Sequence, residues 1–131
     1  MKANELMVGD WVYGINGNRE TPSCIAAVDI YPTNKTPRVV VFGGYGYQQE
    51  NLKPIMITKE ILKANGFEED PEDGTMCLVN KELEEVTWRG TVLKIDSLSD
   101  SLELVSCMYL HQLQHALRLC GLNDLADNFK I

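Results

Sequence analysis

The chain has 131 residues, of which 44% are hydrophobic and 24% charged, and its formal net charge is −7. This length suits about one ordinary domain with a modest core. Its apolar runs are far shorter than the roughly 18–20 residues of a membrane-spanning helix, and the residues after Met1 do not form the apolar segment of a signal peptide. The composition therefore excludes a disordered chain and a spanning helix, and it predicts a cytoplasmic protein.

Residues 1–54 have the pattern of short strands separated by turns. Runs of β-branched and aromatic residues predict strands at 8–13, 24–31, 38–42 and 45–48. Asn16-Gly17 predicts a tight turn, because asparagine and glycine readily adopt positive φ, and the glycine pair at 43–44 predicts a second one. The segment 32–37, bounded by prolines, is expected to end the second strand. Short strands at this spacing favour a small barrel, and an SH3-like barrel fits the size best.

The second part of the chain combines strands with helices. Thr58 is placed to cap a short helix that Gly66 ends. Strands are expected at 76–79, 84–88, 91–95 and 102–105. Ser106 is the predicted N-cap of a helix that runs to Leu119 or Cys120, and a further short helical turn is expected at 123–129.

The C-terminal helix is amphipathic. At about 100° per residue its apolar face holds Tyr109, Leu110, Leu113, Ala116, Leu117 and Cys120. His111, Gln114, His115 and Arg118 fall on the opposite arc, where solvent exposure is expected. The predicted fold is α+β and mainly β, with an SH3-like barrel over residues 1–54 and a subdomain over 55–131. In that subdomain the C-terminal helix covers an antiparallel sheet.

Charge is spread unevenly between these two parts. Residues 1–54 carry five basic and five acidic side chains, whereas residues 55–131 carry seven basic and fourteen acidic ones. Affinity for nucleic acid depends on lysine and arginine that displace counterions from phosphates, and neither part offers a basic stripe. The charge pattern disfavours nucleic acid as a partner and favours a protein partner, a basic one in particular.

Three segments in this order carry a resemblance to a known family. They are residues 1–6 leading into the Val-Gly-Asp-Trp-Val run at 8–12, residues 54–67, and the Tyr-Leu-His-Gln-Leu-Gln-His run at 109–115. The chain resembles a family of small uncharacterised proteins of gut-bacterial genomes, often encoded in prophages and other mobile elements. The resemblance implies a cytoplasmic, mobile-element-associated protein, and it implies no catalytic residue.

Two histidines raise the question of a metal site. His111 and His115 are four residues apart, the spacing of the zinc ligands in the His-Glu-x-x-His motif of metalloproteases. The second position is Gln112, which cannot act as a general base, and the sequence identifies no third ligand. A small metal-dependent hydrolase using His111 and His115 stays open as an alternative. The main prediction includes no cofactor and no catalytic residue.

Cysteine chemistry and the other loops offer weaker signals. The four cysteines show no Cys-x-x-Cys spacing, which favours reduced thiols over a zinc or disulfide scaffold. Cys107 would lie at a helix N-terminus, where a thiolate nucleophile is favoured, but no orienting third group is evident. The glycine-rich run 43–47 lacks the lysine of a phosphate-binding loop, and the acidic run 68–74 fails the EF-hand pattern.

Aromatic side chains of the predicted barrel form the candidate binding surface. They are Trp11, Tyr13, Tyr45 and Tyr47. Aromatics at one barrel edge can line a groove for an extended peptide, although one of them is expected to belong to the core. Stacking on single-stranded bases is the other reading, which keeps a nucleic-acid-binding barrel as an alternative. The sequence thus favours a non-enzymatic protein-binding module.

Overall fold

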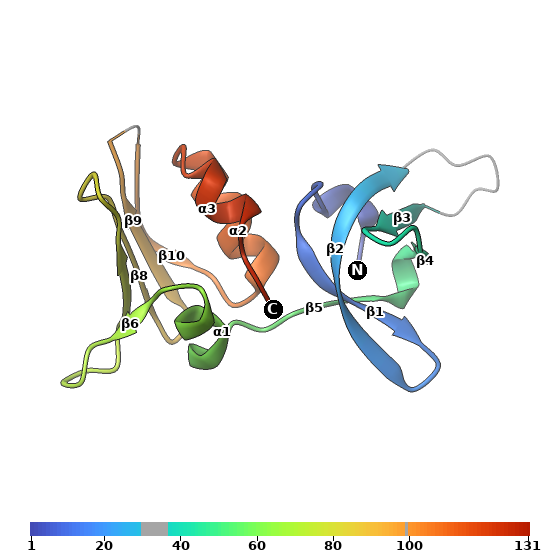
Figure 1. The fold of residues 1–131 in the computed structure, drawn as a ribbon, viewed down its shortest axis with the longest axis horizontal. Coiled ribbons are helices and arrows are strands. Elements are labelled where there is room, and N and C mark those ends of the chain that lie inside the picture. The colour runs from blue at the N-terminus through green and yellow to red at the C-terminus, as the bar shows by residue number, and fades with distance from the viewer. Residues whose placement is uncertain (30–36, 99) are drawn as a thin grey trace. The chain divides into compact units, whose positions relative to one another are not determined.

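The computed structural model describes residues 1–29, 37–98 and 100–131 (Figure 1). The chain forms two compact units, Met1–Ile55 and Met56–Ile131. Each unit contains its own five-stranded antiparallel sheet, so the architecture is α+β and mainly β, as predicted. In the described part of the chain, no helix has the length and apolar character needed to cross a membrane.

Unit 1 is built almost entirely from short strands. Its elements are η1 (Ala3–Glu5), β1 (Trp11–Asn16), β2 (Arg19–Asp29), β3 (Arg38–Val41), β4 (Gly46–Gln48), η2 (Gln49–Asn51) and β5 (Leu52–Pro54). The strands lie in the order β4-β3-β2-β1-β5. Asn16 pairs with Arg19 across the β1–β2 turn, where Gly17 adopts a φ of 63°, which confirms the predicted turn. Most of the predicted break at 32–37 lies outside the described residues.

The core of unit 1 depends on one close backbone approach. Its buried residues are Ala3, Leu6, Val12, Ile25, Val39, Val41, Tyr47 and Leu52. The ring of Tyr47 lies directly against Gly14 of β1, and a Cβ at Gly14 would come within 2.2 Å of the Tyr47 Cζ atom. Glycine is therefore required at this position by space rather than by backbone conformation, because the ring occupies the volume of a side chain.

Unit 2 packs helices against one face of its sheet. Its elements are α1 (Lys59–Ala64), β6 (Glu68–Glu69), β7 (Met76–Val79), β8 (Glu85–Arg89), β9 (Val92–Asp96), β10 (Ser101–Ser106), α2 (Leu110–Leu119) and α3 (Asn123–Asp127). Sheet order follows chain order, from β6 at one edge to β10 at the other. Figure 1 shows α1, α2 and α3 on the same side of this sheet.

The core of unit 2 lies between the sheet and these helices. The strands contribute the buried residues Met76, Val86, Trp88, Leu93 and Ile95, and the helices contribute Leu62, Leu110, Leu113 and Leu117. Alternation along β8 and β9 places Val86, Trp88, Leu93 and Ile95 on the face toward the helices. Thr87 and Lys94, which lie between them in the strands, point to the other face. The predicted apolar face of the C-terminal helix is thus confirmed for its three leucines.

Helix boundaries follow the capping residues in one case and not in the other. The Thr58 hydroxyl accepts a hydrogen bond from the Ile61 N–H at 3.2 Å, as the sequence predicted for α1. The prediction of Ser106 as the N-cap of α2 is wrong, because Ser106 is the last residue of β10 and the cap is Tyr109. The Gln112 side chain accepts hydrogen bonds from the N–H groups of Met108 and Tyr109, which starts the helix three residues later.

Candidate functional site

The four aromatic residues predicted to form a binding surface are divided between the two faces of the unit 1 sheet. Trp11 and Tyr13 are half-buried and lie on the face of β1 opposite Val12, whereas Tyr47 is in the core. Of the four, only Tyr45 is exposed, with 52% of its surface accessible. Its ring packs on that of Tyr47 with centroids 4.8 Å apart. The set does not form one continuous aromatic groove, and a peptide contact at Tyr45 stays a prediction.

The two histidines differ in exposure, because His111 is buried and His115 is half-buried. The rings of His111 and His115 are 5.7 Å apart, but His111 is buried and stacks on Tyr109. Gln114, on the same predicted arc, is fully buried, and its side-chain amide donates to the carbonyl of Ala126 at 3.1 Å. The prediction of an exposed arc is wrong for these two residues. Gln114 is covered because α3 packs on its side of α2, and His111 stacks on Tyr109.

In the described part of the chain, the chemistry suggested for the histidines and for Cys107 finds no support. Across the described ranges, no group of three or more histidine, cysteine or acidic side chains is placed to hold a metal ion. Cys107 is buried in extended backbone before α2 rather than at its N-terminus, and burial raises the pKa of its thiol to about 12. A thiol with so high a pKa is protonated at neutral pH, so the structure gives no support to Cys107 as a nucleophile.

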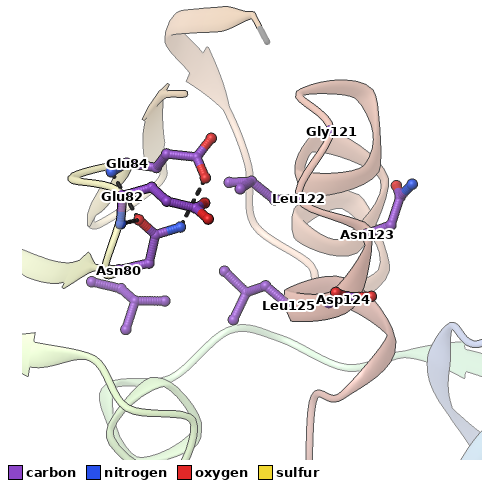
Figure 2. A pocket seen from close by; sticks show the side chains of 9 residues that line it. Asn80, Glu82, Glu84, Gly121, Leu122, Asn123, Asp124 and Leu125 are labelled. Atoms are coloured by element: carbon purple, nitrogen blue, oxygen red, sulfur yellow. Dashed lines mark hydrogen bonds between the residues drawn. The ribbon is translucent and has the colours of Figure 1, made fainter. Parts of the chain in front are cut away.

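A concave site lies in unit 2, between the β7–β8 turn and the α2–α3 junction (Figure 2). We call it the acidic cleft; it has a volume of about 550 Å³ and is lined by Leu78, Asn80, Glu82, Glu84, Gly121, Leu122, Asn123, Asp124 and Leu125. Three leucines supply apolar surface, and three carboxylates, those of Glu82, Glu84 and Asp124, supply negative charge. The lining includes no lysine, arginine or histidine.

Glu84 is the carboxylate that the fold holds in place. Its Oε1 accepts a hydrogen bond from the side-chain amide of Asn80 at 2.9 Å, and its Oε2 accepts one from the Leu98 N–H at 3.0 Å. The hydrogen bond from Asn80, followed by the one from Leu98, holds the pKa of Glu84 below its ordinary value. Glu84 is therefore a charged carboxylate at neutral pH even though its side chain is buried.

Both walls of the acidic cleft are tied to the β9–β10 turn. The bond from Leu98 anchors the β7–β8 turn through Glu84. On the helix side, the Ser97 hydroxyl donates to the carbonyl of Cys120 at the end of α2, at 2.7 Å. Gly121 then reverses the chain with a φ of 81°, which brings Leu122 over the sheet side of the cleft. Hydrogen bonds to one turn therefore connect the two walls of the cleft.

Glu84 is expected to make the stability of unit 2 depend on pH. Its pKa is lower in the folded chain than the ordinary 4.5, so its contribution is present above pH 4.5 and is lost as the pH falls through the lowered pKa. We expect Glu84→Gln to be less stable than the parent at neutral pH, because glutamine offers an N–H group where the Leu98 N–H needs an acceptor. The difference should shrink in urea unfolding measured below pH 4.5. Glu60→Gln, at an exposed site, is the control, and a pH-independent difference would contradict the assignment.

Sequence reasoning did not find the acidic cleft. Its lining comes from a turn at 80–84 and a helix junction at 121–125, which are about forty residues apart in the chain. The one available signal was the excess of acidic residues after residue 55. That signal predicts the charge of a surface but not the concave shape that gathers three of the carboxylates.

No protein-family model, curated protein sequence or solved structure significantly matches this chain. The site must therefore be interpreted from its own geometry.

Proposed function

We propose that this chain is a non-enzymatic binding module for a basic partner protein, and that the acidic cleft receives a lysine or arginine side chain of that partner. The observation that carries the proposal is the pairing of apolar walls with three carboxylates and no cation in one cavity. Lysine and arginine have an apolar stem and a charged head, so one such side chain can pack on the leucines while its head reaches the carboxylates.

Glu84 makes the cleft suited to a cation. The Glu84 carboxylate lines the cleft, and it is held there by hydrogen bonds from Asn80 and Leu98, with a further contribution from the Ser97 side chain. Because Glu84 is already buried and charged, an incoming cation gains attraction without desolvating this carboxylate a second time. Glu82 and Asp124 are exposed, so they attract the basic partner as it approaches and also contact its cation in the cleft.

The proposal is tested with the full chain and a short peptide of alternating leucine and lysine. Amide shifts in an NMR titration should centre on Asn80, Glu82 and Leu122. Glu82→Gln combined with Asp124→Asn should weaken binding by about tenfold, which corresponds to the loss of about 1.4 kcal/mol from two charged contacts.

The control removes two charges elsewhere in unit 2. Glu60→Gln combined with Glu72→Gln lowers the negative charge equally at exposed sites that do not line the cleft. Affinity should stay within about twofold of the parent, because only distant screened charges are removed. An equal loss of affinity in both double variants would mean unspecific attraction to an acidic surface, and an absence of shifts at the cleft would also overturn the proposal.

The finer parts of the expectation from sequence complete the proposal. We infer an SH3-like barrel for unit 1, on the support of five short antiparallel strands around a single core. A cytoplasmic location rests on the composition and on the family resemblance, and an accessory role in a prophage or other mobile element rests on the resemblance. Neither enters the reasoning on the acidic cleft.

A further inference from the structure

The face of the unit 2 sheet that points away from the helices contains a second hollow. We call it the sheet-face hollow; it has a volume of about 480 Å³ and is lined by Thr75, Thr87, Arg89, Val92, Lys94 and Leu104. Its residues come from β8, β9 and β10 and from the residue before β7. The two charged side chains in this lining, Arg89 and Lys94, are both cations, although residues 55–131 carry twice as many acidic as basic residues.

Leu104 reaches this hollow through an irregularity in β10. Leu102 pairs with Ile95 and Val105 pairs with Leu93, so one extra residue is inserted between them. Strict alternation would place Leu104 on the same side as Leu102. The bulge instead leaves Leu104 73% exposed beside Val92, at a φ of 48° that leucine rarely adopts. Backbone strain and an exposed apolar side chain coincide here, which is typical of contact sites.

The distribution of charge indicates the chemistry of the occupant. The Arg89 guanidinium lies 4.0 Å from the carboxylate of Asp73, which is a loose ion pair. The Arg89 side chain is 69% exposed. Glu85 and Asp96 do not line the hollow, although they line a neighbouring one on the same face together with Thr87 and Lys94. An acidic ligand therefore meets cations over the hollow and would be repelled farther along the sheet. The hydroxyls of Thr75 and Thr87 add two donors suited to carboxylates.

We propose that the sheet-face hollow binds an acidic, amphipathic peptide segment of a partner protein. An apolar side chain of that segment packs on Leu104 and Val92, and a neighbouring carboxylate pairs with Arg89 or Lys94. A peptide fits better than a small ligand because β10 is an edge strand, so its outward backbone groups lie beside the hollow and can pair with an extended chain. This site is separate from the acidic cleft and does not depend on the function proposed for it.

The test uses the full chain and three short peptides of alternating sequence: leucine–glutamate, leucine–glutamine and leucine–lysine. In NMR titrations the glutamate peptide should shift the amides of Thr87, Val92 and Leu104, and it should bind about tenfold more tightly than the glutamine peptide because two cations lie over the site. Arg89→Gln should remove most of that preference. Equal binding of the glutamate and glutamine peptides, or no shifts at these amides, would overturn the proposal.

Leu104→Gly separates binding from folding. Glycine accepts the left-handed backbone without strain, so the variant should unfold at the same or a higher urea concentration while binding the glutamate peptide about tenfold more weakly. Leu83→Gly is the matched control, because Leu83 is also exposed, at 83%, and left-handed, with a φ of 62°, but lies outside the hollow. It should bind the peptide as the parent does. Unchanged binding by Leu104→Gly would contradict the proposal.

Discussion

Gly14→Ala is expected to destabilise unit 1 by about 3 kcal/mol, the upper range for inserting a methyl group into a packed core. The new Cβ would lie 2.2 Å from the Cζ atom of Tyr47, and two further ring atoms lie within 2.7 Å. The ring is buried in the core of unit 1, so moving it aside would disturb the packing of that core. An alanine in a strand is otherwise more favourable than glycine, so a loss of this size can come only from the collision with the ring.

Urea unfolding of a chain that contains 5-fluorotryptophan measures this effect. The signal of Trp11 reports the unfolding of unit 1, and the signal of Trp88 reports the unfolding of unit 2. Gly46→Ala is the matched control, since nothing lies within 4 Å of a Cβ at Gly46 in β4. It should leave the Trp11 transition unchanged. Combining Gly14→Ala with Tyr47→Leu should recover part of the loss by removing the ring. A transition for Gly14→Ala that matches the parent would show that Tyr47 can move aside.

Leu113→Ala is expected to destabilise unit 2 by about 3 kcal/mol, the middle of the range for deleting a buried leucine side chain. Leu113 is fully buried on the face of α2 that covers the sheet. Its removal leaves a cavity between the helix and the strands, which the surrounding residues can fill only in part.

Leu119→Ala on the same helix is the control for that substitution. Leu119 is 68% exposed, so the same change of residue removes little buried surface and should shift the free energy of unfolding by less than about 0.5 kcal/mol. The Trp88 signal in urea reports both variants, because the Trp88 indole donates to the Cys107 carbonyl inside the same core. Similar losses for the two variants would mean that helix propensity, rather than packing, dominates the stability of α2.

Features that depend on a few neighbouring residues were predicted correctly. The Thr58 cap of α1 and the turn at Gly17 each follow from the local preferences of one or two side chains. The strands predicted at 84–88 and 91–95 are a third case, since they form β8 and β9, with Arg89 paired with Val92. In each, the atoms that decide the conformation lie within a few residues of one another in the chain.

Features that depend on a distant neighbour were predicted wrongly or missed. Ser106 has the side chain of a helix cap, but the pairing of β10 with β9 holds it in a strand. His111 and Gln114 fall on a polar arc by periodicity, yet both are buried, Gln114 because the helix that follows packs on it. Leu104 would have been placed inside by alternation, and only the bulge turns it outward.

By itself, the sequence determined most of the longer strands, the apolar face of the C-terminal helix and the acidic character of residues 55–131, because these follow from residue type and from spacing along the chain. Tertiary structure alone decided which polar residues are buried and which apolar residues are exposed. It also decided that Glu84 is held between two turns and that Arg89, Lys94 and Leu104 share one hollow. The physical reason is that burial and concavity depend on what packs against a residue, and that neighbour comes from a distant part of the chain.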